Sequence, residues 1–240
     1  MSKMNLTKWG VIAVALLTYL MPSDVKAQDK VEVSLGADLV SGYVWRGQDL
    51  GGVSLQPSIS ISKGGLSLTG WGSVGLEKTD TREFDLTLGY STGGLSLAFT
   101  DYWFNYSDSE IDSKYFDYGA HSTVHVFEAT IGYDFGPLAL SWNTNIGGAD
   151  GTKENGDRAY SSYFEASAPF KLGGVDCSAE VGGTPWENTF YGASGFAITN
   201  IGFKGTKEIK VTDSFTLPVF AKAIWNPCSD RAYLTFGVTF

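Results

Sequence analysis

His121 and His125 are the histidines of the chain, and they flank Ser122 and Thr123. A histidine beside a hydroxyl is the combination used in acyl transfer, where the imidazole takes the proton of the nucleophile. In an extended strand, residues two apart share a face. Ser122 adjoins His121 and therefore faces the other way, which leaves Thr123 two residues on. Because no other nucleophile–base pair presents itself in the sequence, we expect no enzymatic activity.

Residues that could bind metal ions are equally sparse. Residues 150–157 resemble a calcium-binding loop, but Asn155 stands where that loop needs glycine, which favours a solvated turn. Two histidines and two distant cysteines make no transition-metal cluster. Cys177 and Cys228 fall near opposite ends of the predicted structure, which excludes a disulfide. We therefore predict no cofactor and no metal.

A larger set of ionisable residues lies on the polar side of segments that alternate in polarity. If the apolar sides face lipid, as in a membrane barrel, the polar sides line the interior. Acids outnumber bases on these polar faces, which predicts a net-negative lumen that favours cations or neutral solutes over anions. The lumen candidates are Glu32, Asp38, Arg46, Glu83, Asp85, Glu128, Glu165, Glu180, Lys222 and Arg231.

A second interpretation of these charges stays open. They could form salt bridges and hydrogen bonds that fill a narrow interior and leave no channel. Barrels of eight strands are filled by side chains, whereas those of sixteen leave a channel. The twelve strands predicted below lie between the two cases.

The last ten residues indicate how these side chains are positioned. Ala232, Leu234, Phe236, Val238 and Phe240 share one face, and polar residues share the other. Such alternation up to a final aromatic residue is typical of the closing strand of an outer-membrane barrel. The stretch also resembles the C-terminal signal of bacterial outer-membrane barrels. We therefore expect outer-membrane lipid and, through Phe240, the barrel-assembly machinery of a Gram-negative cell as partners.

The same alternation recurs along the chain and predicts an all-β, antiparallel, up-and-down transmembrane barrel. The twelve predicted strands cover about residues 31–45, 53–62, 66–76, 82–90, 95–104, 123–133, 138–146, 159–170, 175–183, 195–204, 210–225 and 231–240. The first strand is expected to pair with the last, which places Arg231 near the outer mouth. The count could differ by two.

The turns between these segments follow a pattern. Residues 64–68, Gly-Gly-Leu-Ser-Leu, recur at 93–97 and are echoed at 136–140 and 173–177. Each of these tight turns follows an even-numbered strand, so they lie at one end of the structure. Connections after odd-numbered strands are generally longer, which is the asymmetry of outer-membrane barrels.

The longest connection, about residues 101–122, mixes acids with aromatics. It could fold into the mouth as a constriction, or it could be two strand tips and a surface hairpin; we slightly favour the second interpretation. The candidate residues of this loop are Asp101, Trp103, Tyr106, Tyr115 and Tyr118.

The N-terminus predicts export. Lys3 and Lys8 flank the start of an apolar core that reaches Met21, and a cleavage region ends at Ala27. We therefore assign residues 1–27 to a signal peptide and 28–240 to the barrel. The formal net charge of −9 argues against nucleic acid as a partner.

Ser41-Gly42-Tyr43-Val44-Trp45-Arg46-Gly47-Gln48, followed by Gln56-Pro57, resembles the opening of the TorF-type porin family. The match covers about seventeen residues, and the order of Gln and Pro departs from the family pattern. The resemblance implies an outer-membrane barrel with a presumed pore. Tyr43, Arg46 and Gly47 carry over, and their first role is expected to be structural.

We therefore expect a channel for passive diffusion of small neutral or cationic solutes. The alternative is a filled barrel that acts through its surface loops as an adhesin or an assembly partner. A lipid-modifying enzyme is a third, disfavoured hypothesis.

Overall fold

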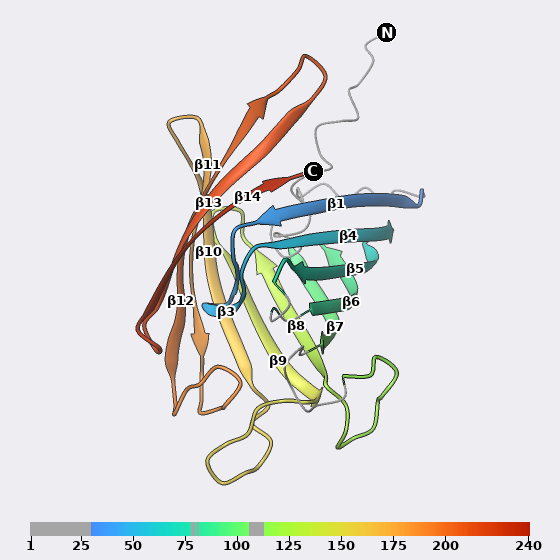
Figure 1. The fold of residues 1–240 in the computed structure, drawn as a ribbon, viewed down its shortest axis with the longest axis vertical. Helices are drawn as coiled ribbons and strands as arrows, with labels where there is room; N and C mark the ends of the chain where they lie inside the picture. Colours follow the sequence, from blue (N-terminus) through green and yellow to red (C-terminus); the bar gives the residue numbers. More distant parts are fainter. Residues whose placement is uncertain (1–29, 78–79, 81, 106–112) are drawn as a thin grey trace.

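The computed structural model describes residues 30–77, 80, 82–105 and 113–240, and within them the regular structure consists of strands (Figure 1). In this described part of the chain no helix has the length and hydropathy needed to cross a membrane. The predicted signal peptide and Tyr106 lie outside the described residues.

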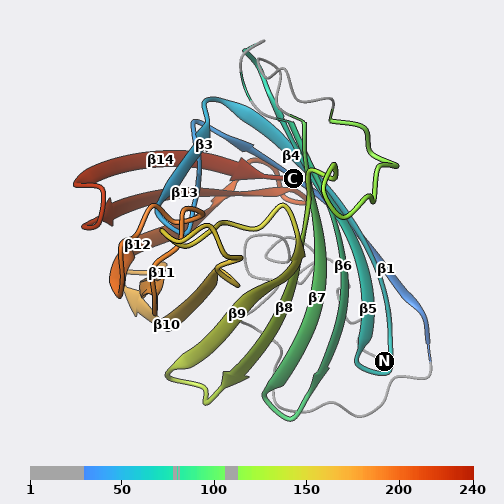
Figure 2. The same cartoon turned by 90° about the horizontal axis from the view of Figure 1, so that it is seen from below.

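Twelve strands close into an antiparallel barrel in the order β1-β14-β13-β12-β11-β10-β9-β8-β7-β6-β5-β4, which confirms the predicted fold (Figures 1 and 2). The barrel strands are β1 (Glu32–Val40), β4 (Ser54–Lys63), β5 (Leu66–Gly75), β6 (Arg82–Thr92), β7 (Leu95–Asn105), β8 (His125–Asp134), β9 (Ala139–Gly148), β10 (Ser162–Leu172), β11 (Val175–Thr184), β12 (Ala197–Lys210), β13 (Thr216–Asn226) and β14 (Arg231–Thr239). Two further strands, β2 (Tyr43–Trp45) and β3 (Gln48–Gly51), form a small separate sheet.

The period-2 pattern puts the apolar side chains on the outer face of the barrel. On β14, Leu234 and Phe236 are 60% and 52% exposed, whereas Thr235 between them is 7% exposed. The same contrast holds on β6, where Leu86 is 38% exposed and its neighbour Asp85 is 8% exposed. A soluble protein rarely exposes so much contiguous apolar surface, so this wall is suited to an apolar surrounding.

The two ends of the barrel differ. Tight connections at residues 64–65, 93–94, 135–138, 173–174 and 211–215 form the short-turn end. The connections at 41–53, 106–124, 149–161 and 185–196 are longer and form the long-loop end, while 227–230 is a short turn at this second end. The predicted difference in connection length between the two ends is therefore present. Each Gly-Gly repeat lies at the short-turn end, as expected.

Three predicted strand boundaries were wrong by five residues or more. The first strand was expected to run to Trp45, but β1 ends at Val40 and the next residues turn into the β2–β3 hairpin. Alternation continues through Tyr43 and Trp45, so periodicity alone could not reveal this break. The tenth strand was expected to end at Lys204 and the eleventh to begin at Lys210, but β12 continues to Lys210 and β13 begins only at Thr216.

The first and last strands pair as predicted, but over a short length. Three register pairs join them, Asp38↔Thr239, Leu39↔Val238 and Val40↔Gly237. Backbone hydrogen bonds between Ala37 and Phe240 and between Ser41 and Phe236 flank these pairs. By contrast, β1 pairs with β4 along all nine of its residues. This closing seam is therefore a narrow junction in the wall.

Candidate functional site

The β2–β3 hairpin leaves the wall between β1 and β4 and reaches across the interior at the long-loop end (Figure 2). Trp45 pairs with Gln48, so Arg46 and Gly47 form a two-residue turn. Both have positive φ, 51° and 80°. This is the conformation of a type I′ turn, which suits the twist of a tight hairpin. The Arg-Gly sequence therefore forms the tip of an inward hairpin.

The backbone of the tip is fixed to the wall at β12 and β13. The amide of Asn226 at the end of β13 donates to the carbonyl of Gly47 at 3.0 Å. The hydroxyl of Thr199 on β12 donates to the carbonyl of Arg46 at 3.3 Å. A Cβ at position 47 would lie 1.8 Å from the carbonyl oxygen of Thr199. Glycine is required here both for this close approach and for the positive φ.

The Arg46 side chain forms a bidentate ion pair with Glu128 of β8. Its two terminal nitrogens donate to the carboxylate at 2.5 Å and 3.0 Å. The side chains are 11% and 2% exposed. Tyr102 also donates to Glu128, at 2.9 Å, and Arg46 donates to the hydroxyl of Tyr191 at 2.8 Å. A paired geometry of this kind binds an arginine in one orientation.

Aromatic rings enclose the same guanidinium group. The Arg46 Cζ atom lies 4.3 Å from the centroid of the Trp45 ring and 4.7 Å from that of Tyr163. Trp45 in turn contacts Tyr102 and Phe190, with centroid distances of 5.6 Å and 6.3 Å. Cation–π contacts gain strength when the cation is desolvated. The hairpin, the wall and the 185–196 loop therefore form one packed layer, which we call the hairpin layer.

A second charged group lies on the wall of β10 to β13. Lys222 and Glu180 form an ion pair at 2.7 Å. Asn200 donates to Glu180 at 2.8 Å, and Tyr163 donates to Glu165 at 2.7 Å. The Glu180 side chain lies over β12 at position 202, where glycine leaves room for it. A Cβ atom at residue 202 would lie 2.6 Å from the Glu180 side chain.

Two acids of β6 have a different environment. Glu83 and Asp85 point inward and are 6% and 8% exposed. Tyr43 of the hairpin interacts with Glu83, and its ring lies 5.6 Å from that of Trp71. The Oδ1 atoms of Asp85 and of Asp38 on β1 are buried without a hydrogen-bond partner. This sector of the interior therefore holds three carboxyl groups, of Asp38, Glu83 and Asp85, that form no ion pair with a basic side chain in the described part of the chain.

Toward the short-turn end of the barrel most inward side chains are small, with Phe220 of β13 as an exception. Hydroxyl pairs line the inner wall there, with Thr69 to Ser60 at 2.8 Å and Thr87 to Thr100 at 3.0 Å. Most of these positions are only partly buried, unlike those around Arg46. Other members of this hydroxyl-lined vestibule, as we call it, are Ser58, Ser67, Ser96, Thr130, Ser141, Ser167, Ser178, Thr206 and Thr239.

The described part of the β7–β8 connection packs on the outside of the barrel (Figure 2). His125, on the outward side of β8, bonds through Nδ1 to Asp101 at 2.6 Å and through Nε2 to the carbonyl of Tyr115 at 2.7 Å. Tyr118 stacks on His125 with a centroid distance of 4.5 Å, and Trp103 contacts Tyr115. The candidate loop residues that the structure describes therefore gather outside the lumen and do not constrict it.

Two groups of this loop have shifted pKa values. Burial, followed by the charge of Asp101, raises the pKa of Tyr118 to about 12. A hydrogen bond from the Gly119 backbone, followed by one from Ser122, lowers the pKa of Asp117. Both shifts favour the ordinary states at neutral pH, a protonated phenol and an ionised carboxyl.

Ser122 and His125, from the histidine–hydroxyl stretch considered in the sequence, both have other partners. Ser122 donates to Asp117 at 2.8 Å, and both ring nitrogens of His125 are held by Asp101 and Tyr115. Within the described ranges, no three His, Cys, Asp or Glu side chains come together as a metal site. Cys177 and Cys228 are free thiols.

Two of the lumen candidates, Glu32 and Arg231, are not among the residues of the hairpin layer, and several inward residues were not predicted. Glu32 and Arg231 lie at exposed ends of β1 and β14, at opposite ends of the barrel. Lys204 was not predicted, although it faces inward beside Lys222, with Nζ 4.2 Å from the Phe220 ring centroid. The alternation of Ile201 and Phe203 already places residue 204 on the opposite, inward face, so the sequence held the signal for it. Tyr102, Tyr163 and Asn200 were also missed, because neutral polar residues give no charge signal.

Comparison with known proteins adds no family assignment. Neither the family models nor the curated proteins include a match to this chain.

Proposed function

We propose that the protein is an outer-membrane channel for passive diffusion of small neutral or cationic solutes, narrowed at its long-loop end by the β2–β3 hairpin. The hydroxyl-lined vestibule is the observation that carries this proposal. Small side chains leave room beside the wall, and their hydroxyl groups can replace water around a polar solute. The apolar outer wall and the resemblance to the TorF-type porin family support a membrane location.

The inward charges support the preference for cations. Acids predominate in the interior, and Arg46 and Lys222 are both neutralised by carboxylates. Asp38, Glu83 and Asp85 carry no comparable ion pair with a described basic residue. On this side of the lumen a cation meets carboxyl groups that have no basic partner, which favours a cation over an anion. The proposal includes no catalytic step.

Swelling of proteoliposomes with sugars of graded size tests the channel. We expect swelling with small sugars that ends sharply as solute size increases. Liposomes that contain the folded barrel but swell no faster than empty ones would exclude the proposal.

The hairpin layer favours one alternative, a closed barrel that acts through its loops. Five hydrogen bonds hold the Arg46–Gly47 tip, which is a large number for a movable element. Under this alternative, truncating residues 113–124 abolishes partner binding, and the barrel shows no permeability before or after truncation.

A further inference from the structure

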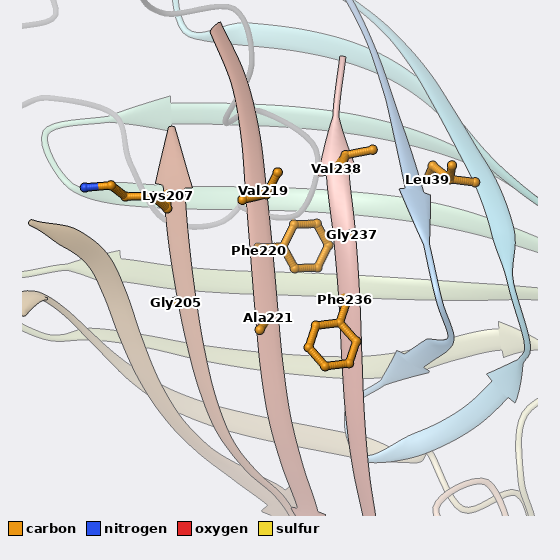
Figure 3. Close-up of a pocket in the computed structure, with 9 residues that line it drawn as sticks. All are labelled: Leu39, Gly205, Lys207, Val219, Phe220, Ala221, Phe236, Gly237 and Val238. Atoms are coloured by element: carbon orange, nitrogen blue, oxygen red, sulfur yellow. The ribbon is translucent and has the colours of Figure 1, made fainter. Parts of the chain in front are cut away.

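A concave apolar groove of about 520 Å³ lies on the outer wall beside the closing seam (Figure 3). Gly205 and Ala221 are direct register partners and form its floor. Phe236, Val219 and Val238 rise around this floor because they carry larger side chains. The wall is therefore hollowed where two neighbouring strands both carry minimal side chains.

The groove has one charged lining residue. Lys207 of β12 borders it with its alkyl stem, and its ammonium donates to the carbonyl of Gly174 at 2.8 Å, at the short-turn end. An ammonium has three donor hydrogens, so two remain after this bond. The groove is thus apolar, and a cation lies just beyond its β12 edge (Figure 3), which is complementary to an anionic amphiphile.

We propose that the groove binds one acyl chain of an anionic glycerophospholipid, with the lipid phosphate against Lys207. This inference rests on the proposed membrane location but not on the channel activity. The location of Lys207 near the short turns assigns the lipid to the leaflet on that side.

The outward positions of β1, β12, β13 and β14 favour a lipid over a second copy of the chain. In these described strands no outward position carries a carboxylate. A second copy seated on this face would therefore bury the Lys207 ammonium without an acid, which is costly. A lipid phosphate supplies the missing negative charge.

The bound chain would also brace the barrel. Leu39 of β1 and Val238 of β14 both line the groove and are partners across the closing seam. With three register pairs, this junction has few ladder hydrogen bonds. An acyl chain in the groove contacts both sides of the junction and adds dispersion contacts there.

Native mass spectrometry of the purified full barrel, after incubation with equal amounts of phosphatidylglycerol and phosphatidylcholine, tests the site. We expect one retained phosphatidylglycerol per barrel. Ala221→Phe fills the floor of the groove and should abolish this retention. Ala223→Phe is the matched control, because Ala223 is also outward and exposed, two residues along β13 but outside the groove.

Lys207→Gln tests the headgroup contact. It should reduce the preference for phosphatidylglycerol about fivefold, the factor that one lysine contributes near an anionic lipid. Lys210→Gln is its control, since Lys210 is already paired with Asp213 at 2.6 Å.

Equal retention in the Ala221→Phe and Ala223→Phe variants would overturn the inference, because it would indicate ordinary lipid contact around the whole wall. Dimers that Ala221→Phe dissociates would overturn it in favour of a second copy. Bilayer conductance of the same samples separates the two proposals. Lipid retention without conductance contradicts the channel alone, and conductance with equal retention contradicts the groove alone.

Discussion

At the scale of single residues, Arg46 and Gly47 have different roles in the same turn: one acts through its side chain and the other through its backbone. Gly47 permits the approach to Thr199, and Arg46 supplies the charge that reaches Glu128. Neither residue can take the role of the other. The buried Arg46 side chain requires a buried acid, Glu128, to balance its charge. The backbone at residue 47 can approach Thr199 only if that residue has no Cβ atom.

Gly47→Ala tests the backbone contact. Gly64→Ala is the matched control, because Gly64 also has a positive φ, 58°, but a Cβ there meets no atom within 4 Å. The control should lose about 1–2 kcal/mol of folding free energy, the cost of a non-glycine residue in this conformation. Gly47→Ala should lose clearly more, because it also displaces the tip. Urea unfolding in detergent measures both, and equal losses would contradict the tight packing of the tip.

Glu128→Gln tests the ion pair. It removes the charge from one partner and leaves the buried Arg46 guanidinium uncompensated, which costs about 3–5 kcal/mol. The exposed Glu208 on β12 gives a matched Glu→Gln control with little expected effect. A Glu128→Gln barrel as resistant to urea as the control would show that the aromatic enclosure holds Arg46 without the carboxylate.

At the scale of elements, the β2–β3 hairpin decides how the lumen is divided. It leaves the wall because β1 ends at Val40, directly opposite Ser54 of β4. Those two strands could be joined by a tight turn, so the hairpin is an insertion into a wall that does not need it for closure.

Replacing residues 42–52 by Asn-Gly, a strong two-residue turn, should therefore leave the barrel folded and widen the channel. We expect single-channel conductance in planar bilayers to rise severalfold, because the replacement removes the hairpin residues that narrow the lumen. Shortening the 149–161 loop is the comparison, because it contributes no residue to the Arg46 contacts. Conductance unchanged by hairpin removal would place the constriction elsewhere.

At the scale of the whole molecule, charge is distributed unevenly around the interior. Glu83, Asp85 and Glu128 lie on β6 and β8, whereas Lys204 and Lys222 lie on β12 and β13. The hairpin brings Arg46 to the acidic side. The net field thus depends on few residues, and single substitutions should alter selectivity measurably.

Lys204→Glu should raise the ratio of potassium to chloride permeability, because it replaces an inward cation by an anion without touching the hairpin layer. Reversal potentials across a salt gradient measure this ratio. Lys153→Glu, in the 149–161 loop, makes the same change of charge outside the lumen and should have a much smaller effect. Equal shifts for both variants would mean that surface charge sets the selectivity.

The sequence by itself determined the barrel, its strand count and the inward side of most charged residues. Side-chain alternation has a period of two whatever the partner strand, and Gly-Gly turns mark the hairpins locally. Thus the pairing of the first strand with the last followed from counting strands, and the inward side of Glu128 followed from its neighbours Phe127 and Ala129.

Only the tertiary structure decided what those residues meet. Tyr43 and Trp45 continue the alternation of β1, so the turn of the chain into the lumen leaves no local signal. The Arg46–Glu128 pair joins residues 82 positions apart, and the groove extends from β1 across β14 and β13 to β12. Such contacts depend on the stagger of strands around the closed barrel, which no single stretch of sequence encodes.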